Sequence, residues 1–297
     1  MTGAPRGPRT DGVHTDGAHT EYTEYTERTP RVVAARKLTR RAGREAERLF
    51  LAEGPQAVRE ALWLAGAGRP GAVRELFGTD EALSRYPELA ASAARQRIRI
   101  SRVTARAVAG LSETSTPQGL VAVCEFLDAG LAAALDHPAG GSARLVAVLA
   151  DVRDPGNAGA VLRGADAAGA DAVLFAGDSV DPYNGKAVRA SAGSLFHLPV
   201  VRGAPLVEVV AAARAAGLAV LAADGAGAAD LDVLQDSGAL TRPTAWIFGN
   251  EAAGLSAADA ALADARVRIP LHGRAESLNL AAAAALCLYA SARAHRR

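Results

Sequence analysis

Polar residues with the capacity for chemistry follow three apolar segments in the C-terminal half of the chain. Asn157 and Arg163 come after "RLVAVLADV", Glu251 follows "TAWIFG", and Ser277 and Asn279 follow "ARVRIP". A carboxylate at a strand end has a charge that water and nearby amides can set, and free backbone donors collect where a helix begins. Each residue also has a plainer interpretation, as a helix cap or a surface arginine. The three segments must converge before these residues can form a site.

The turn "DVRDPGNAGAVLR" has the outline of a nucleotide-binding strand, turn and helix. Pro and Gly favour a turn, Asn157 is placed to cap the helix that follows, and Gly159 allows close backbone approach. Gly156 and Gly159 alone do not supply the dinucleotide fingerprint G-x-G-x-x-G, and no acidic residue closes the next strand, "DAVLFAG". A nucleotide-binding oxidoreductase is therefore disfavoured.

Five short apolar segments predict the strands that position these residues: "RLVAVLADV", "DAVLFAG", "LAVLAAD", "TAWIFGNE" and "ARVRIPL". Their continuous apolar character indicates strands buried on both faces, hence a mostly parallel sheet with Ala-rich helices between the strands. Ligands bind outside the carboxyl ends of such strands, where the polar residues lie. We predict an α/β domain over residues 144–297, with the site at that edge of its sheet.

A smaller α/β domain is expected over residues 31–126, where apolar strands and helical segments alternate. It begins with a basic helical stretch, and "DEALSRYPELAASAARQ" predicts one helix. Residues 127–143 are predicted to be a linker with a helical turn. Residues 1–30 repeat short Gly- and Thr-rich units, which predicts a disordered tail in which His14 and His19 are solvated rather than metal ligands.

Charge and composition narrow the class of protein. The net charge of the 297 residues is only +1, yet residues 31–126 carry 16 Lys and Arg against 10 Asp and Glu. Almost all of these bases are arginine, whose planar fork suits phosphate. The chain lacks an apolar run long enough for a membrane span and a visible secretory signal. Cys124 and Cys287 lie in apolar runs, which favours buried thiols in the cytoplasm and no disulfide or metal site.

Several of these segments together resemble one family. "NAGAVLR", "IFGNEAAGLS" and "IPLHGRAESLNLAAAAAL" are similar to the three signature motifs of the SpoU (TrmH-like) branch of the SPOUT RNA methyltransferases, and "NGKAVRASAGSLFHLPV" resembles the segment between the first two. "LFLAEGPQAVREAL" and "LSETSTPQGLVAVC" resemble the ribosomal-protein-like substrate-binding domain of the same enzymes. The resemblance covers nearly everything except the tail.

The resemblance implies a fold and a cofactor. The C-terminal domain would be a trefoil-knotted parallel sheet with helices on both faces, although general topology rules favour an unknotted sheet. S-adenosylmethionine would bind among backbone groups, where glycines let an adenine and a sulfonium lie close to the main chain. The residues implied as cofactor-binding are Gly249, Asn250, Gly254, Ile269, Leu271 and Leu278.

The implied reaction is methyl transfer to a ribose 2′-hydroxyl in structured RNA. Arg163 would meet the hydroxyl, either as proton acceptor, as family proposals have it, or by stabilising the alkoxide, since a guanidinium stays protonated in nearly all proteins. Glu251 and Asn157 would orient Arg163 and the ribose. Ser277 and Asn279 would hold the cofactor end and the target phosphate.

Substrate and partners follow from the same resemblance. The N-terminal domain favours large-subunit ribosomal RNA, with transfer RNA as the alternative and a non-catalytic RNA-binding adaptor as a weaker one. Arg40, Arg41 and Arg44 are predicted to contact RNA. The family forms homodimers through the knotted domain, and the small side chains of "LNLAAAAALCLYASARA" fit close helix packing, although burial within one chain explains them equally well.

Overall fold

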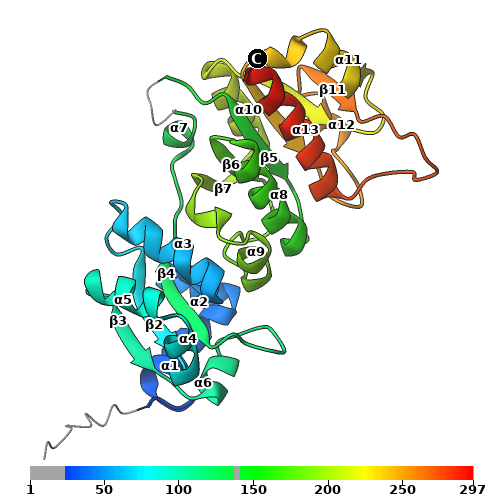
Figure 1. Cartoon of the computed structure of the whole chain (residues 1–297). Helices are drawn as coiled ribbons and strands as arrows, with labels where there is room; N and C mark the ends of the chain where they lie inside the picture. Colours follow the sequence, from blue (N-terminus) through cyan, green and yellow to red (C-terminus); the bar gives the residue numbers. More distant parts are fainter. Residues whose placement is uncertain (1–23, 137–140, 297) are drawn as a thin grey trace, which may run out of the picture.

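The computed structural model describes residues 24–136 and 141–296. The two tail histidines and residues 1–23 lie outside this part. Residues just after them are folded, because Tyr25 forms a parallel bridge with Val103, its N–H donating to the Arg102 carbonyl at 2.8 Å. The described chain forms two α/β parts, and in Figure 1 the C-terminal part lies above the N-terminal part.

A four-stranded sheet organises the N-terminal part, with the order β1-β4-β2-β3. β1 and β2 each pair antiparallel with β4, whereas β3 pairs parallel with β2. These strands are β1 (Leu49–Glu53), β2 (Val73–Gly78), β3 (Arg99–Arg102) and β4 (Leu120–Glu125). The small α/β architecture predicted for this region is present.

Helices surround this sheet, and one of them differs from the prediction. The segment expected to form a single helix is divided into two, because Pro87 begins a new helix and Tyr86 leaves the helical conformation with φ −124°. The elements are α1 (Pro30–Arg36), η1 (Lys37–Thr39), α2 (Arg41–Glu47), α3 (Pro55–Gly66), α4 (Asp80–Arg85), α5 (Pro87–Arg95) and α6 (Ala105–Ala109).

A seven-stranded parallel sheet organises the C-terminal part, with the order β7-β6-β5-β10-β8-β11-β9. The five predicted strands are all present, as β5 (Leu145–Ala150), β6 (Ala172–Ala176), β8 (Ala219–Ala223), β10 (Thr244–Phe248) and β11 (Ala265–Arg268). Two edge strands were not predicted, β7 (Val200–Ala204) and the two-residue β9 (Ala229–Asp230).

Both faces of this sheet are covered, as the continuous apolar runs predicted. Leu145, Ala147 and Leu149 of β5 pack with α8 and α13, while Val146 and Val148 pack with α10 on the other side. Figure 1 shows α8 and α13 side by side on one face. The elements are α7 (Leu131–Ala134), α8 (Pro155–Ala168), α9 (Gly185–Ala190), η2 (Ser194–Phe196), α10 (Leu206–Ala215), α11 (Leu231–Asp236), η3 (Ala239–Thr241), α12 (Ala257–Ala260) and α13 (Leu280–His295).

The core is continuous between the two sheets. Phe50 of β1 lies 4.7 Å, between ring centroids, from Tyr183 and 5.9 Å from Phe196, both of which belong to the C-terminal part. Phe126 stacks on Tyr183 at 4.2 Å. Cys124 and Cys287 are free and buried, as predicted. The two parts are thus joined by apolar contact as well as by the chain.

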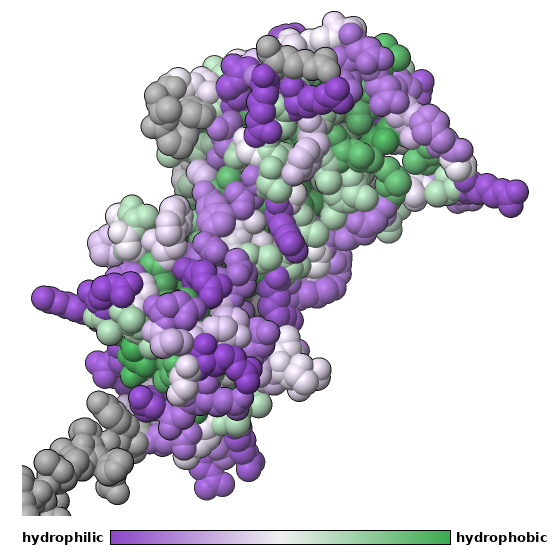
Figure 2. Space-filling view, viewed as in Figure 1, coloured by the Kyte–Doolittle hydropathy of each residue, from purple (hydrophilic) through white to green (hydrophobic). Residues whose placement is uncertain are grey.

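The face that α13 presents to solvent is partly apolar. Ala282, Leu286, Tyr289 and Arg293 are exposed at helical spacing, and about half of the Leu286 and Tyr289 side chains is accessible (48% and 50%). Figure 2 shows hydrophobic residues gathered over this helix. Among the helices of residues 24–136 and 141–296, none is long and apolar enough to cross a membrane.

Candidate active site

Three of the five predicted polar residues meet at the carboxyl ends of β5 and β10. The amide nitrogen of Asn157 donates to Glu251 Oε1 at 3.2 Å, and the amide nitrogen of Asn279 donates to Asn157 Oδ1 at 2.9 Å. These contacts join residues more than 90 positions apart, on the first turn of α8, after β10, and at the start of α13. The structure therefore brings Asn157, Glu251 and Asn279 into one hydrogen-bonded chain.

Local folding assigns the helix caps differently from the prediction at one of these positions. Asp154, not Asn157, caps α8, because its carboxylate accepts from the Asn157 backbone N–H at 2.8 Å and Pro155 begins the helix. The Asn157 side chain is thereby left to contact Glu251. Asn279 does cap α13, accepting from Ala281 N–H at 2.9 Å. One side chain thus starts the helix and contacts the site.

Glu251 is held as an ionised carboxylate. Burial alone raises the pKa of its carboxyl, but the backbone N–H groups of Arg153 and Asp154, at 3.1 and 3.0 Å, and the Asn157 amide lower it by more. A carboxylate with these donors fixes the turn between β5 and α8. Glu251 is therefore a positioning residue for Asn157.

A cavity of about 180 Å³ opens beside Glu251, at the ends of β8, β10 and β11. All six residues predicted to bind a cofactor line it, together with Ser277 and Glu276. The lining also includes Asp224 and Gly225, which the sequence analysis missed. They follow β8, the strand predicted from "LAVLAAD", at the same sheet edge as the other predicted site residues, so the position of ligands at strand ends indicates them equally.

The wall of this cavity depends on glycines in a tight loop. Asn250 and Gly254 exchange backbone hydrogen bonds of 3.0 and 2.8 Å, and Gly254 has φ +66°. A Cβ on Gly249 would lie 2.6 Å from the Gly254 carbonyl carbon. The Asn250 side chain donates to the Asp151 carbonyl at 3.0 Å, which ties the loop to the end of β5.

Arg163 stands apart from the other predicted residues. It lies six residues beyond Asn157, about 9 Å further along α8. Its side chain is exposed, does not line the cavity, and makes no hydrogen bond or ion pair with the residues that the structure describes. The single chain therefore does not bring Arg163 to the site.

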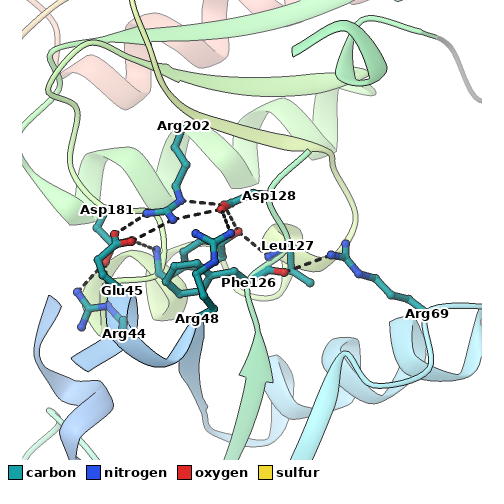
Figure 3. Close-up of polar contacts among 10 residues, drawn as sticks. Arg44, Glu45, Arg48, Arg69, Phe126, Leu127, Asp128, Asp181 and Arg202 are labelled. Atoms are coloured by element: carbon teal, nitrogen blue, oxygen red, sulfur yellow. Dashed lines mark hydrogen bonds and ion pairs between the residues drawn. The ribbon is translucent and has the colours of Figure 1, made fainter. Parts of the chain in front are cut away.

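Arg44 does not lie where the prediction of RNA contact requires. It is buried (2% exposed), its guanidinium pairs with Asp181 at 2.8 Å, and it donates to the carbonyls of Leu38 and Thr39. Arg44 thus forms an ion pair between the N-terminal and C-terminal parts of the chain (Figure 3). Arg40 and Arg41 are exposed, so their predicted contact with RNA stays a prediction.

Further charged residues complete this contact, which we call the interdomain joint and define as Arg44, Glu45, Arg48, Phe126, Asp128, Asp181, Tyr183 and Arg202. Arg202 donates to Asp128 at 2.8 Å and to Glu45 at 2.7 Å, and Arg48 reaches Asp128 from the other domain at 2.7 Å. Both guanidiniums lie over the Phe126 ring, at 4.5 and 4.6 Å. Figure 3 shows the partners converging on Asp128.

Metal chemistry has no visible support in the part of the chain that is described, because no three potential ligands cluster there. The chemistry available is therefore that of a carboxylate, amides, hydroxyls and arginines beside a glycine-walled cavity.

Comparison with known proteins gives consistent matches along the chain. Residues 144–289 match the SpoU rRNA Methylase family, and residues 29–122 match the MRM3-like substrate binding domain. The 23S rRNA (guanosine(2553)-2'-O)-methyltransferase RlmP of Bacillus subtilis is 37% identical over 254 residues, which are 86% of this chain and 92% of that protein.

Two solved structures align over nearly the whole chain. An AdoMet-bound rRNA methyltransferase from Sinorhizobium meliloti has a TM-score of 0.77 at 33% identity and covers 91% of this chain and 97% of its own. The SpoU methyltransferase AviRb from Streptomyces viridochromogenes, in complex with AdoMet, has a TM-score of 0.74 at 32% identity, with 90% and 98% coverage.

Proposed function

Because the chain belongs to the SpoU rRNA methylase family, we propose that it methylates a ribose 2′-hydroxyl of large-subunit ribosomal RNA with S-adenosylmethionine as the donor. The observation that carries this proposal is the glycine-walled cavity, which shares Glu251 with the hydrogen-bonded chain of Asn157 and Asn279. A substrate group and a cofactor can meet where the two features join.

The cavity fits the cofactor in shape and charge. Gly225 and Gly254 have open space where a side chain would stand, so a flat adenine can lie against the backbone. Ile269 and Leu278 offer apolar contact, and the carboxylates of Glu251 and Glu276 suit a cation. When bound, S-adenosylmethionine supplies a methyl group made electrophilic by the sulfonium.

The residues of this chain hold and polarise the ribose. A 2′-hydroxyl is a weak nucleophile, so the site must stabilise the alkoxide that develops as its proton leaves. Arg163 carries a cation that can do so without accepting the proton, which passes to water or a phosphate oxygen. Glu251 orients Asn157 toward the ribose, and Ser277 and Asn279 hold the cofactor end and the target phosphate.

The active form is a homodimer paired through α8 and α13. Two observations support this: the exposed Leu286 and Tyr289 on α13, and the exposed Arg163 on the neighbouring helix, away from the cavity of its own chain. Pairing of these faces covers the apolar stripe seen in Figure 2. It also offers Arg163 the cavity of the second subunit.

The remaining parts of the proposal concern organisation. Residues 31–126 form the RNA-binding domain, 127–143 the linker and 144–297 the methyltransferase domain, in which the chain is knotted. The resemblance of the C-terminal motifs to those of the SPOUT enzymes supports the knot. Free, buried cysteines support a cytoplasmic location.

Mapping 2′-O-methyl groups in RNA from cells with and without the gene tests the proposal. One 23S rRNA site is expected to disappear without the gene and to be restored in vitro by the purified protein and S-adenosylmethionine. Loss confined to a transfer RNA would establish the alternative substrate, and an unchanged map would contradict the proposed activity.

A further inference from the structure

A second cavity, polar rather than apolar, lies at the seam between the two domains. Its volume is about 650 Å³, and four arginines line it: Arg41 and Arg48 from the N-terminal domain, Arg153 and Arg202 from the C-terminal domain. Three aspartates line it as well, so its chemistry depends on which arginines are already neutralised. We call this cavity the seam cleft.

Two of the four arginines are held by carboxylates. Arg202 is mostly buried and contacts both Asp128 and Glu45, and Arg48 contacts Asp128. Asp181, the second aspartate, is paired with the buried Arg44. These groups neutralise one another and form a fixed floor that joins the domains.

The other two arginines are available to a ligand. Arg41 is exposed and makes no hydrogen bond or ion pair within residues 24–136 and 141–296. Arg153 approaches a carboxylate only loosely, at 3.9 Å from the third aspartate, Asp178, whose own side chain is 88% exposed. Two guanidiniums from opposite domains therefore line one cleft without a close partner, an arrangement that suits the oxygens of a phosphate.

The seam cleft adjoins the active site. The Arg153 backbone N–H donates to Glu251 at 3.1 Å while the Arg153 side chain lines the cleft. The Asp178 backbone N–H likewise donates to Asp151, on the turn that leads to Asn157. A strand whose ribose lies beside Asn157 thus has a route across Arg153 into the cleft.

Basic residues continue the route onto the N-terminal domain. Arg36, Lys37 and Arg40 are exposed on α1, η1 and the start of α2, and they too form no ion pair in the part of the chain that is described. Many other arginines of this domain are paired, such as Arg59 with Glu88 and Arg85 with Glu81. Arg40, next to Arg41 in the sequence, therefore adds an unpaired positive charge close to the cleft, whereas among the described residues Arg95, Arg97 and Arg99 leave unpaired charges at the far edge of the sheet.

We propose that the seam cleft holds a backbone phosphate of the RNA strand adjoining the methylated nucleotide, between Arg41 of one domain and Arg153 of the other. This inference rests on the proposed function and extends it, because it assigns RNA binding to both domains at once. A phosphate shared in this way places the ribose relative to the active site as well as adding affinity.

RNA binding by single and double variants tests the proposal. Arg41→Ala and Arg153→Ala are each expected to weaken binding of a 23S rRNA transcript about tenfold and to lower the salt slope by about one. If one phosphate lies between them, the double variant loses less than the product of the two single losses. As a control for folding, the affinity of each variant for S-adenosylmethionine is measured and is expected to equal that of the wild type.

Arg95→Ala is the matched control. Like Arg41, Arg95 is an exposed arginine with no partner among the described residues. It is the last residue of α5, which packs on β3, and β3 lies at the opposite edge of the sheet from β1 and α2. Its loss is expected to leave RNA affinity within about twofold of wild type, because only nonspecific charge is removed. Equal effects of Arg95→Ala and Arg41→Ala would overturn the proposal.

Three further outcomes are decisive. If the wild-type protein methylates the transcript and both cleft variants bind RNA as tightly as wild type, the seam-cleft proposal is wrong but the proposed function stands. If the wild-type protein does not methylate the transcript, the proposed function is wrong. Fully multiplicative losses in the double variant would reject a shared phosphate. Tight binding of inorganic phosphate, measured calorimetrically without RNA, would show a site for a small phosphorylated ligand instead.

Discussion

The interdomain joint and the active-site edge contain similar residues in opposite states. In the joint, Arg44 and Asp181 each have a side chain only 3% exposed and are fully paired. At the edge, Ser277 is exposed and makes no hydrogen bond that the described residues supply, and the same holds for Arg163, further along α8. Buried charges are tolerated only when paired, so the joint is complete as it stands. The exposed groups near the edge remain open to solvent in this chain.

Protonation equilibria show how the joint holds its charges. Burial raises the pKa of Asp128, but hydrogen bonds from Arg202, Tyr183 and Arg48 lower it by more. Asp128 is therefore ionised and paired within the joint. The Tyr183 pKa is raised by burial and by the Asp128 charge, which keeps its hydroxyl a donor. Glu251 at the edge is likewise held ionised by hydrogen bonds, so the two regions differ in their exposed arginine and serine rather than in their carboxylates.

The largest expected effect comes from removing the exposed cation of Arg163 on α8. Arg163→Ala should slow methyl transfer about 1,000-fold, because the alkoxide loses its stabilising charge. Arg163 does not line the cavity, so affinity for S-adenosylmethionine should stay close to wild type. Single-turnover methylation and cofactor titration measure the two quantities, and a near wild-type rate would remove Arg163 from the mechanism.

Mixed dimers show which subunit's cavity Arg163 serves. Co-expression of Arg163→Ala with a variant defective in the cavity should restore about a quarter of wild-type activity if Arg163 acts across the interface, because half of the dimers are mixed and each has one intact site. A mixture as inactive as its components would place Arg163 and the cavity in the same chain.

The joint is expected to respond in stability rather than in chemistry. Arg44→Ala leaves Asp181 buried without its cation and should lower the free energy of unfolding by about 3 kcal/mol or more. Arg40→Ala, which removes an exposed arginine four residues earlier, should change it by less than about 0.5 kcal/mol. Equal denaturation midpoints for the two variants would show that the buried pair is unimportant.

The loop between Gly249 and Gly254 offers a more moderate change at the edge. The Gly249→Ala methyl group would lie 2.6 Å from the Gly254 carbonyl carbon, so the loop must shift away from the cavity wall. Cofactor affinity should fall about tenfold or more, the cost of a displaced backbone being about 1–3 kcal/mol. Gly273→Ala, with nothing within 4 Å of its Cβ position, is the control. Equal affinities for the two variants would contradict the packing argument.

The sequence predicted the C-terminal sheet well because its signal is local. β5 and β10 are continuous apolar runs, and burial on both faces follows directly from that pattern. β7 was not predicted because three of its five residues, Arg202 to Ala204, are polar or small, so it lacks a continuous apolar run. The broken helix at Pro87 was predictable from the proline alone.

The site was predictable in part, for a similar reason. Strand ends identified Glu251 and the residues near Asn279, and the parallel sheet explains why they meet. The cap at Asp154 was missed because Asn157 is an equally good capping residue by type. The burial of Arg44 depends on Asp181, 137 positions away, and nothing local distinguishes it from the exposed Arg40 and Arg41.

The smallest expected effect lies at the other end of the domain seam, where the contact uses a histidine. His197 Nδ1 lies 2.7 Å from Asp166 of α8, and Nε2 lies 3.1 Å from Glu60 of α3. Only an imidazolium donates from both nitrogens. Partial burial lowers the His197 pKa, but the two carboxylates raise it by more, so the folded value exceeds the ordinary 6.5.

A raised histidine pKa makes this contact sensitive to pH, unlike the arginine-based joint. Its stabilisation is fully present below pH 6.5, the ordinary histidine value, and is lost as the pH rises through the higher folded value. Because the ring is partly exposed, the contribution is about 0.5–1 kcal/mol. The difference in unfolding free energy between wild type and His197→Gln should therefore shrink from pH 6 to pH 8.5, and Arg44→Ala should show no such trend. A difference that stays constant would show that both ends of the seam are insensitive to pH, and one that grows with pH would show that the folded protein favours the neutral ring.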